Sequence, residues 1–308
     1  MWFFFALATT LLWGVAELFY KKGAKPYEKY SHLKISMIVG FVMGIHAIFV
    51  FITSFIIGGE VFDPRNFYIY LPVTFCYILS MSLSYFGMRF IEESISDPIE
   101  NTSGALCSVF CVVFLGDEMS VWAVTAVAVL LVGVLGLGFL DNSGETDRKK
   151  VLGKKMALVA FAMPFLYALF DAIGSTLDEL YLDIEISPLV NVTEDSIELV
   201  ANTCYEFSFL IVGIIIFIFI KAKGEKVELP KQGDKILAAI CETAGQFTYV
   251  YAMSGGHGVI SAPILSSVCV VSFILSHIFL KERLTKKQYV CVALVIIGIL
   301  ALAIIEGE

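Results

Sequence analysis

Five carboxylic acids interrupt otherwise apolar stretches of this sequence: Glu17, Glu100, Asp171, Glu206 and Glu242. A charge inside a lipid bilayer is costly, so each acid is a candidate functional residue if these stretches cross a membrane. No Lys or Arg lies well inside the same stretches. Each acid must therefore be protonated, exposed to water in a cavity, or paired with a cation. The chemistry it could perform is the binding of a proton or of a cationic solute.

Two of the acids follow an aromatic residue by one helical turn: Trp13 precedes Glu17, and Tyr167 precedes Asp171. Residues four apart lie on the same face of a helix. An aromatic ring beside a carboxylate can bind an ammonium group through charge pairing and a cation–π contact. For Glu17 an alternative is an ion pair with Lys21, four residues later, whereas Asp171 has no such basic neighbour.

A third group of polar residues combines Glu242, Gln246 and Tyr249 on one helix face, and the counterpart of Glu242 in the internal repeat of the chain is Tyr77. A carboxyl group held there, away from bulk water, could exchange protons near neutral pH. We therefore expect Glu242 to take part in proton coupling.

Glu100 has a different interpretation because it ends the sequence Asp97-Pro98-Ile99-Glu100. An Asp at the N-cap, a Pro at the first helical position and a Glu at the third form a capping box. We expect Glu100 to cap a helix rather than to contact a ligand, and Asn101 to be a weaker candidate for a binding site. His46 is a lone histidine in apolar surroundings, which we expect a neighbouring group to satisfy.

The composition indicates that these residues lie in membrane-spanning helices. The chain has 308 residues, of which 58% are hydrophobic and 16% charged, whereas about a quarter of the residues of a soluble protein are charged. Apolar runs of about 20 residues, enough to cross a bilayer, recur along it. All seven cysteines lie within these runs, where they are expected to be buried small hydrophobes. We predict ten spans, at residues 2–21, 34–57, 66–88, 97–115, 120–140, 154–176, 197–220, 234–254, 258–280 and 286–305.

An internal repeat organises the spans, because the segment Ser96–Leu135 recurs without a gap at Ser261–Leu300. An odd number of spans in each half gives the second half the opposite orientation, as in many secondary transporters. We therefore predict an all-α membrane protein whose ten transmembrane helices form two inverted five-helix repeats. The repeats are residues 1–140 and 154–308, and a polar linker at 141–153 joins them.

The charges of the connections predict an orientation in the membrane. All but one of the 21 Lys and Arg residues lie in the connections after the odd-numbered spans; the exception is Arg65. Basic loops stay cytoplasmic, so both termini of this multi-pass integral membrane protein should face outward. The connection between the sixth and seventh spans is acidic, and it is either a solvated loop or a means of concentrating cations at an outer mouth. Its acids are Asp178, Glu179, Asp183, Glu185, Glu194 and Asp195.

Small residues at four-residue spacing, such as Gly40 and Gly44, let helices approach one another closely. We expect this pair to pack inside the bundle, with assembly into a homodimer left open.

Four features together resemble the drug/metabolite transporter superfamily, EamA-type. These are the step Trp13-Gly14, the helix-starting Pro98 and Pro263, the short acidic turns LGDEMS and LKERLT, and the five-plus-five repeat. The resemblance implies a transporter of small solutes, often coupled to protons, whose cavity is lined by the first, third and fourth helices of each half. It places the seventh span at the periphery, so Glu206 is a weaker candidate. Many members have cytoplasmic termini and a short connection between the sixth and seventh spans, and this chain departs from both patterns.

The function predicted from these observations is secondary active transport of an amino acid or amine-bearing metabolite by alternating access, coupled to protons. The alternatives are a transporter of another metabolite such as a nucleotide sugar and, in a different class, a membrane-embedded enzyme or a receptor or scaffold. The sequence has no HExxH, GxSxG or Walker motif, so we expect no catalytic residue, cofactor or metal. The expected partners are a cationic or zwitterionic solute, protons and the lipid bilayer, and not nucleic acid.

Overall fold

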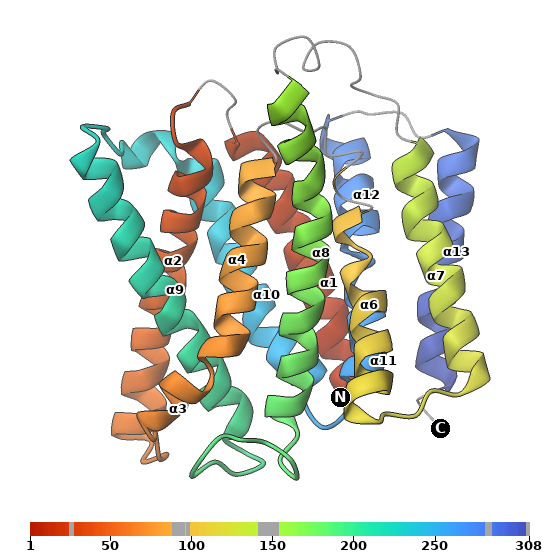
Figure 1. The fold of residues 1–308 in the computed structure, drawn as a ribbon, viewed down its shortest axis with the longest axis horizontal. Helices are drawn as coiled ribbons and strands as arrows, with labels where there is room; N and C mark the ends of the chain where they lie inside the picture. The colour runs from red at the N-terminus through yellow and green to blue at the C-terminus, as the bar shows by residue number, and fades with distance from the viewer. Residues whose placement is uncertain (25–27, 88–95, 97–98, 141–153, 281–284, 306–308) are drawn as a thin grey trace.

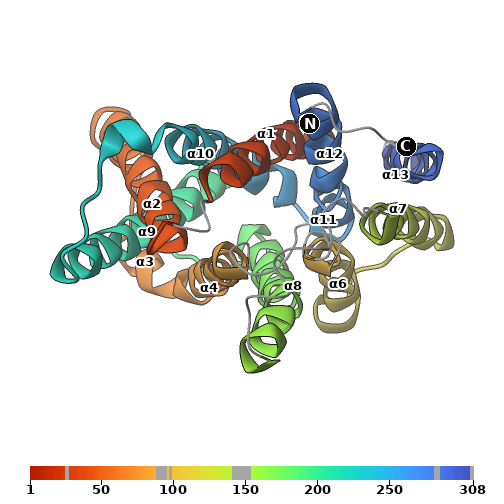
Figure 2. The same ribbon diagram turned by 90° about the horizontal axis from the view of Figure 1, so that it is seen from above.

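The computed structural model describes residues 1–24, 28–87, 96, 99–140, 154–280 and 285–305, and the regular elements of this part of the chain are all helices (Figures 1 and 2). Its main helices are, in chain order, α1 (Trp2–Gly23), α2 (Ser31–Val50) with the π-helical η1 (Phe51–Ile57), α3 (Arg65–Ile69) with α4 (Leu71–Gly87), α6 (Ser103–Phe110) with the π-helical η2 (Cys111–Leu115), α7 (Val121–Leu140), α8 (Lys154–Leu182), α9 (Ile197–Ala222), α10 (Gly233–Met253), α11 (Gly258–Leu265) with α12 (Val268–Leu280), and α13 (Lys286–Ile305).

These elements confirm the predicted spans, with two informative differences. The ninth span is divided at Ser266–Ser267, just after Pro263, which lies inside α11. A proline perturbs the turn that precedes it, and α11 is nevertheless intact through Leu265. At the break itself the hydroxyls of Ser266 and Ser267 donate to the backbone carbonyls of Ala262 and Ile264, over 3.3 Å and 2.5 Å, and such local hydrogen bonds compete with the helical ladder. The sixth span continues to Leu182 as α8. The predicted linker 141–153 lies outside the described residues.

The extension of α8 corrects the interpretation of Asp178 and Glu179 as residues of a solvated connection. Both lie in the helix and are buried. Tyr70 donates a hydrogen bond to Asp178, and the backbone N–H of Gly258 donates one to Glu179 over 2.6 Å. The sequence predicts that these two acids lie in a solvent-exposed connection. In the structure they are buried in α8, where hydrogen bonds from neighbouring elements stabilise them.

Corresponding helices of the two halves run in opposite directions. In Figure 1, α1 rises from the marked N-terminus, whereas α8 descends, and the C-terminus lies at the same end of the bundle as the N-terminus. We call the end with both termini the acidic end, because the connection with Asp183, Glu185, Glu194 and Asp195 lies there. The other end, where α2, α10 and α13 begin, is the basic end. The Lys residues at its connections include Lys22, Lys29, Lys34, Lys221, Lys223, Lys226, Lys231, Lys235, Lys286 and Lys287.

Helix packing follows the order of the repeat. The most extensive contacts join α1 to α10, α4 to α8, α2 to α9, and α7 to α13, and α6 packs on α11. If each helix of one half is replaced by its counterpart in the other half, the same set of contacting pairs results. This symmetry of the contacts is expected of two related halves. In Figure 2 the pairs α2–α9 and α7–α13 occupy opposite edges, so the remaining helices surround the middle of the bundle.

The glycines of α2 face α9. A Cβ atom at Gly40 would collide with the backbone carbonyl oxygen of Phe209, and one at Gly44 would collide with the side chain of Leu210. The close approach of these two helices therefore requires glycine at both positions. The small-residue face is thus used within the bundle, as the sequence predicts.

The outer faces of the bundle are apolar. Large hydrophobic side chains exposed there include Ile45 and Phe49 of α2, Trp122 of α7, Ile215 of α9 and Ile297 of α13. Soluble monomers rarely expose apolar surface on this scale. Three described helical segments are long and apolar enough to cross a membrane, namely Trp2–Tyr20, Ser31–Ile57 and Ile197–Ala222.

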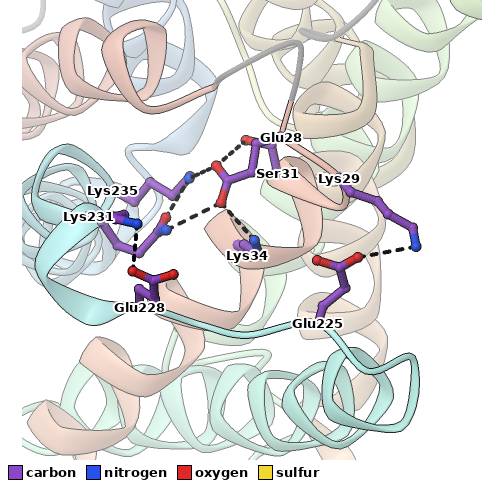
Figure 3. A network of polar contacts seen from close by, with 9 residues as sticks. Glu28, Lys29, Ser31, Lys34, Glu225, Glu228, Lys231 and Lys235 are labelled. Carbon is purple, nitrogen blue, oxygen red and sulfur yellow. Dashed lines mark hydrogen bonds and ion pairs between the residues drawn. The ribbon is translucent and has the colours of Figure 1, made fainter.

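At the basic end, Glu28 joins the start of α2 to the start of α10 (Figure 3). Its carboxylate accepts hydrogen bonds from Lys34 at 2.8 Å and from Lys235 at 2.5 Å, and Lys235 also donates to Gln232 at 2.5 Å. Both lysines are buried. Burial by itself would raise the pKa of Glu28, but the hydrogen bonds from the two lysines outweigh it and lower that pKa from 4.5 to about 2.

Replacement of Glu28 by Gln is expected to destabilise the protein, because it leaves two buried ammonium groups without their carboxylate. Breaking a buried ion pair costs about 3–5 kcal/mol, and the partial exposure of Glu28 places the expected loss on the order of 2 kcal/mol. The pKa of this carboxyl group is lower in the folded protein, so its contribution is complete above pH 4.5 and is lost as the pH falls toward 2. Thermal unfolding in detergent should therefore show a Tm difference at pH 7 that shrinks through this window.

A matched control is Glu225→Gln, which removes the nearby pair of Lys29 and Glu225 (3.2 Å), whose lysine is 62% exposed (Figure 3). Exposed ion pairs contribute about 0–1 kcal/mol. Equal Tm losses in the two variants would contradict a special role of the buried pair.

Candidate functional site

A cavity of about 130 Å³ lies among the central helices. Side chains from both halves line it, drawn from α1, α4, α6, α8, α10 and the α11–α12 segment, together with Tyr205 of α9. Its lining residues are Trp13, Glu17, Tyr20, Tyr77, Met81, Ser84, Tyr85, Glu100, Asn101, Ser103, Gly104, Tyr167, Asp171, Ser175, Tyr205, Glu242, Gln246, Tyr249, Ala262, Leu265, Ser266 and Val268.

The lining is acidic and aromatic. Its four carboxylic acids are Glu17, Glu100, Asp171 and Glu242. One tryptophan and six tyrosines surround them, and among the described lining residues there is no Lys, Arg or His. Ammonium groups pair with carboxylates and are attracted to aromatic faces. The cavity can therefore hold protons or a positively charged group, and its described lining offers no cation to neutralise an anionic solute.

The structure brings together every primary site residue predicted from the sequence. All of them line the cavity, as does the weaker candidate Asn101. The primary residues are Trp13, Glu17, Tyr77, Tyr167, Asp171, Glu242, Gln246 and Tyr249. The side chain of Lys21, the alternative partner of Glu17, lies outside the described part of the structure.

Glu206 is not a cavity residue. Its carboxylate lies 2.8 Å from Nδ1 of His46, so the pair connects α9 to α2 away from the cavity. This contact also satisfies His46, as expected from the sequence. The residue before it, Tyr205, lines the cavity instead, because consecutive residues of a helix point about 100° apart.

One face of α8 supplies Tyr167, Asp171 and Ser175 at four-residue spacing. Asp171 accepts hydrogen bonds from Tyr167 of its own helix and from Ser103 at the start of α6. The aromatic–carboxylate pair predicted for this helix therefore exists, and a second helix holds the carboxyl group in place.

The opposite half of the repeat contributes Trp13, whose ring stacks on Tyr249 at 5.3 Å between centroids and 28° between planes. Its Nε1 atom donates to the backbone carbonyl of Glu242 over 3.4 Å. The adjacent Gln246 is buried, and its Nε2 atom has no hydrogen-bond partner within the described residues. A buried amide donor without a partner is costly, so Gln246 is suited to donate to a polar group of a solute.

A cluster of hydroxyl groups closes the cavity toward the acidic end. The hydroxyls of Tyr77 and Tyr249 lie 2.5 Å apart, and Ser175 lies 3.1 Å from the first and 3.2 Å from the second. The cluster joins α4, α8 and α10, which come from both halves. Separation of the halves at this end would have to break it.

Glu100, which the sequence assigns to a helix cap, also reaches the cavity. Its carboxylate accepts hydrogen bonds from Ser84 of α4 at 2.8 Å and from Ser96 at 2.6 Å, and it lines the cavity. The proposed cap residues Asp97 and Pro98 lie outside the described residues. The capping pattern is local in sequence, whereas the contact with Ser84 depends on the packing of α4, which the pattern cannot show.

Sequence reasoning also missed Tyr20, Tyr85 and Tyr205. The hydroxyls of Tyr20 and Tyr85 lie 3.2 Å apart, toward the basic end of the cavity. A signal was present, since Tyr20 follows Glu17 by three residues and Tyr85 follows Tyr77 by eight, which places each on a predicted site face. No comparable signal marks Tyr205, because the predicted face of α9 is that of Glu206.

Comparison with known proteins agrees with this arrangement. The EamA-like transporter family matches residues 1–139 and 196–304. An uncharacterised protein of Methanocaldococcus jannaschii is 34% identical over 97 residues, covering 30% of this chain and 71% of the relative. A protein crystal structure superposes with a TM-score of 0.70 at 11% identity, covering 98% of this chain and 96% of the other, which supports the fold. The chain is therefore a multi-pass integral membrane protein that belongs to the EamA-like transporter family.

Proposed function

We propose that this member of a family that transports small solutes across membranes is a proton-coupled secondary transporter of an amine-bearing solute, such as an amino acid or a small organic amine. The observation that carries the proposal is the cavity, whose four carboxylic acids and seven aromatic residues come from both halves and have no basic residue among them in the described lining. A nucleotide sugar is a poorer fit, because its phosphates would meet carboxylates with no cation to balance them.

The proposed mechanism is alternating access between two inverted halves, residues 1–140 and 154–308. The halves rock about the cavity, and Asp171 and Glu242 hold either a proton or the ammonium group of the solute. Because the two cations compete for the same carboxylates, binding of one releases the other, which gives exchange coupling. Trp13 and Tyr167 supply ring faces for the ammonium group, and Gln246 donates to its polar substituents.

Uptake into proteoliposomes containing the purified protein tests the proposal. A pH gradient imposed across the vesicle membrane should drive accumulation of at least one radiolabelled amine or amino acid, and an uncoupler should abolish it. Accumulation of an anionic nucleotide sugar, with no amine transported under either direction of the gradient, would replace the proposed solute class by the alternative.

The orientation is a separate prediction: both termini face outward. Single cysteines added before Met1 and after Glu308 should react with a membrane-impermeant maleimide in intact cells. A cysteine in place of the exposed Lys223, at the basic end, should react only after the cells are permeabilised. The reverse pattern would show that the lysine distribution does not set the topology of this protein.

A further inference from the structure

Asp178 continues the cavity-lining face of α8 toward the acidic end. Tyr167, Asp171 and Ser175 line the cavity at four-residue spacing, and Asp178 follows Ser175 by three residues. At about 1.5 Å per residue it lies roughly one helical turn beyond the hydroxyl cluster of Tyr77, Tyr249 and Ser175. The side chain is completely buried. It therefore lies between the cavity and the surface at the acidic end.

The surroundings of Asp178 favour its neutral form. Tyr70 donates a hydrogen bond to Oδ1, Tyr77 also contacts the carboxyl group, and Oδ2 has no partner among the described residues. An ionised carboxylate buried with an unpartnered oxygen would cost several kcal/mol. A carboxylic acid avoids most of that cost, so the closed arrangement requires a proton on Asp178.

The groups facing this region from neighbouring elements carry no positive charge. The titratable groups are Tyr70 and Tyr77 before and within α4, Cys204 and Tyr205 of α9, and Tyr249 of α10, with Asp171 on the same helix. No Lys, Arg or His in the described chain pairs with Asp178. None of these described groups can balance the negative charge of an ionised Asp178, so a proton is what neutralises it in the closed arrangement.

We propose that Asp178 is a proton-binding residue that controls the seal at the acidic end of the cavity, distinct from the carboxylic acids that bind the solute. In the closed state its O–H bond is intact, and Tyr70, Asp178 and the hydroxyl cluster pack together. When the acidic end opens, water reaches the group, the O–H bond breaks and the proton passes to water. The resulting carboxylate cannot be buried again until it takes up a proton from that side.

This inference rests on alternating access as the proposed function, but its consequences for the closed state do not require transport. Infrared difference spectra of wild type and Asp178→Asn at pH 7 should show that the variant has lost a C=O band of a protonated carboxylic acid. The exposed Glu185, at the same end of the bundle, provides a matched control, and Glu185→Gln should retain the band. A band unchanged in Asp178→Asn would overturn the proposal.

Hydrogen exchange tests the seal itself. In wild type, peptides covering residues 70–77 and 175–182 should lose protection between pH 6 and pH 9, after correction for the intrinsic pH dependence of exchange. Asp178→Asn, which cannot ionise, should keep the same protection at both values, and Glu185→Gln should follow wild type. Identical pH dependence in wild type and Asp178→Asn would contradict control of the seal by this residue.

A second variant covers the case in which Asp178→Asn does not fold. Tyr70→Phe keeps the ring and removes only the hydroxyl that donates to Asp178, so the loss of protection should begin at a shifted pH. No shift would contradict the proposal. Failure of the proposed function is recognised separately: the wild-type protein would transport no amine, while the infrared and exchange results on Asp178 would stand.

Discussion

Asp171→Asn and Glu242→Gln are each expected to abolish proton-driven amine uptake while leaving the protein folded. Both acids line the cavity, and both substitutions keep the size of the side chain but remove the charge for which the proton and the ammonium group compete in the proposed mechanism. Loss of one partner of a desolvated charge pair costs about 2–5 kcal/mol, which corresponds to solute binding weaker by roughly 30-fold or more. Uptake should fall to the level of liposomes without protein.

The matched control is Glu206→Gln, which neutralises an acid within the membrane that contacts His46 rather than the cavity. Uptake by this variant should retain its dependence on the pH gradient. The measurements are initial uptake rates and solute binding to the purified protein, with thermal unfolding as a check of the fold. Full activity of both cavity variants would remove Asp171 and Glu242 from the coupling mechanism.

Gly104→Ala is expected to produce the largest loss of stability from the addition of a single methyl group. A Cβ atom there would lie 2.7 Å from the backbone carbonyl carbon of Ala262 and closer still to its oxygen and to Oγ of Ser266. These are mainly backbone atoms of the α11 segment, which cannot move aside as a flexible side chain can. Overpacking of this kind costs about 1–3 kcal/mol, and it would separate α6 from α11, where the two halves meet beside the cavity.

Gly233→Ala provides the comparison, because a Cβ atom at Gly233 meets nothing within 4 Å. Alanine is favoured over glycine in the middle of a helix by about 0.5–1 kcal/mol. Gly233 is the first residue of α10, where that gain is smaller, so this variant should unfold at the same or a slightly higher temperature. Thermal unfolding in detergent compares the two. A Tm for Gly104→Ala equal to that of wild type would show that α6 and α11 are not held at the separation seen in the structure.

The sequence by itself determined the membrane-spanning helices and their number. Hydrocarbon thickness sets the length of each apolar run, and a lipid-exposed backbone must satisfy its own hydrogen bonds within a helix, so the predicted spans need no knowledge of packing. The same holds for pairs on one helix face. Trp13 with Glu17 and Tyr167 with Asp171 reach the cavity together because helical spacing alone aligns them.

Only the tertiary structure decided which face of each helix meets the cavity. In water the apolar face of a helix marks its buried side, but lipid is as apolar as a protein core, so that signal is weak in a membrane helix. Glu206 and Tyr205 are adjacent on α9, and packing against α2 and the central helices sends the first to His46 and the second to the cavity. Likewise, partners distant in sequence decide that Glu100 reaches Ser84 and that Asp178 stays buried beside Tyr70.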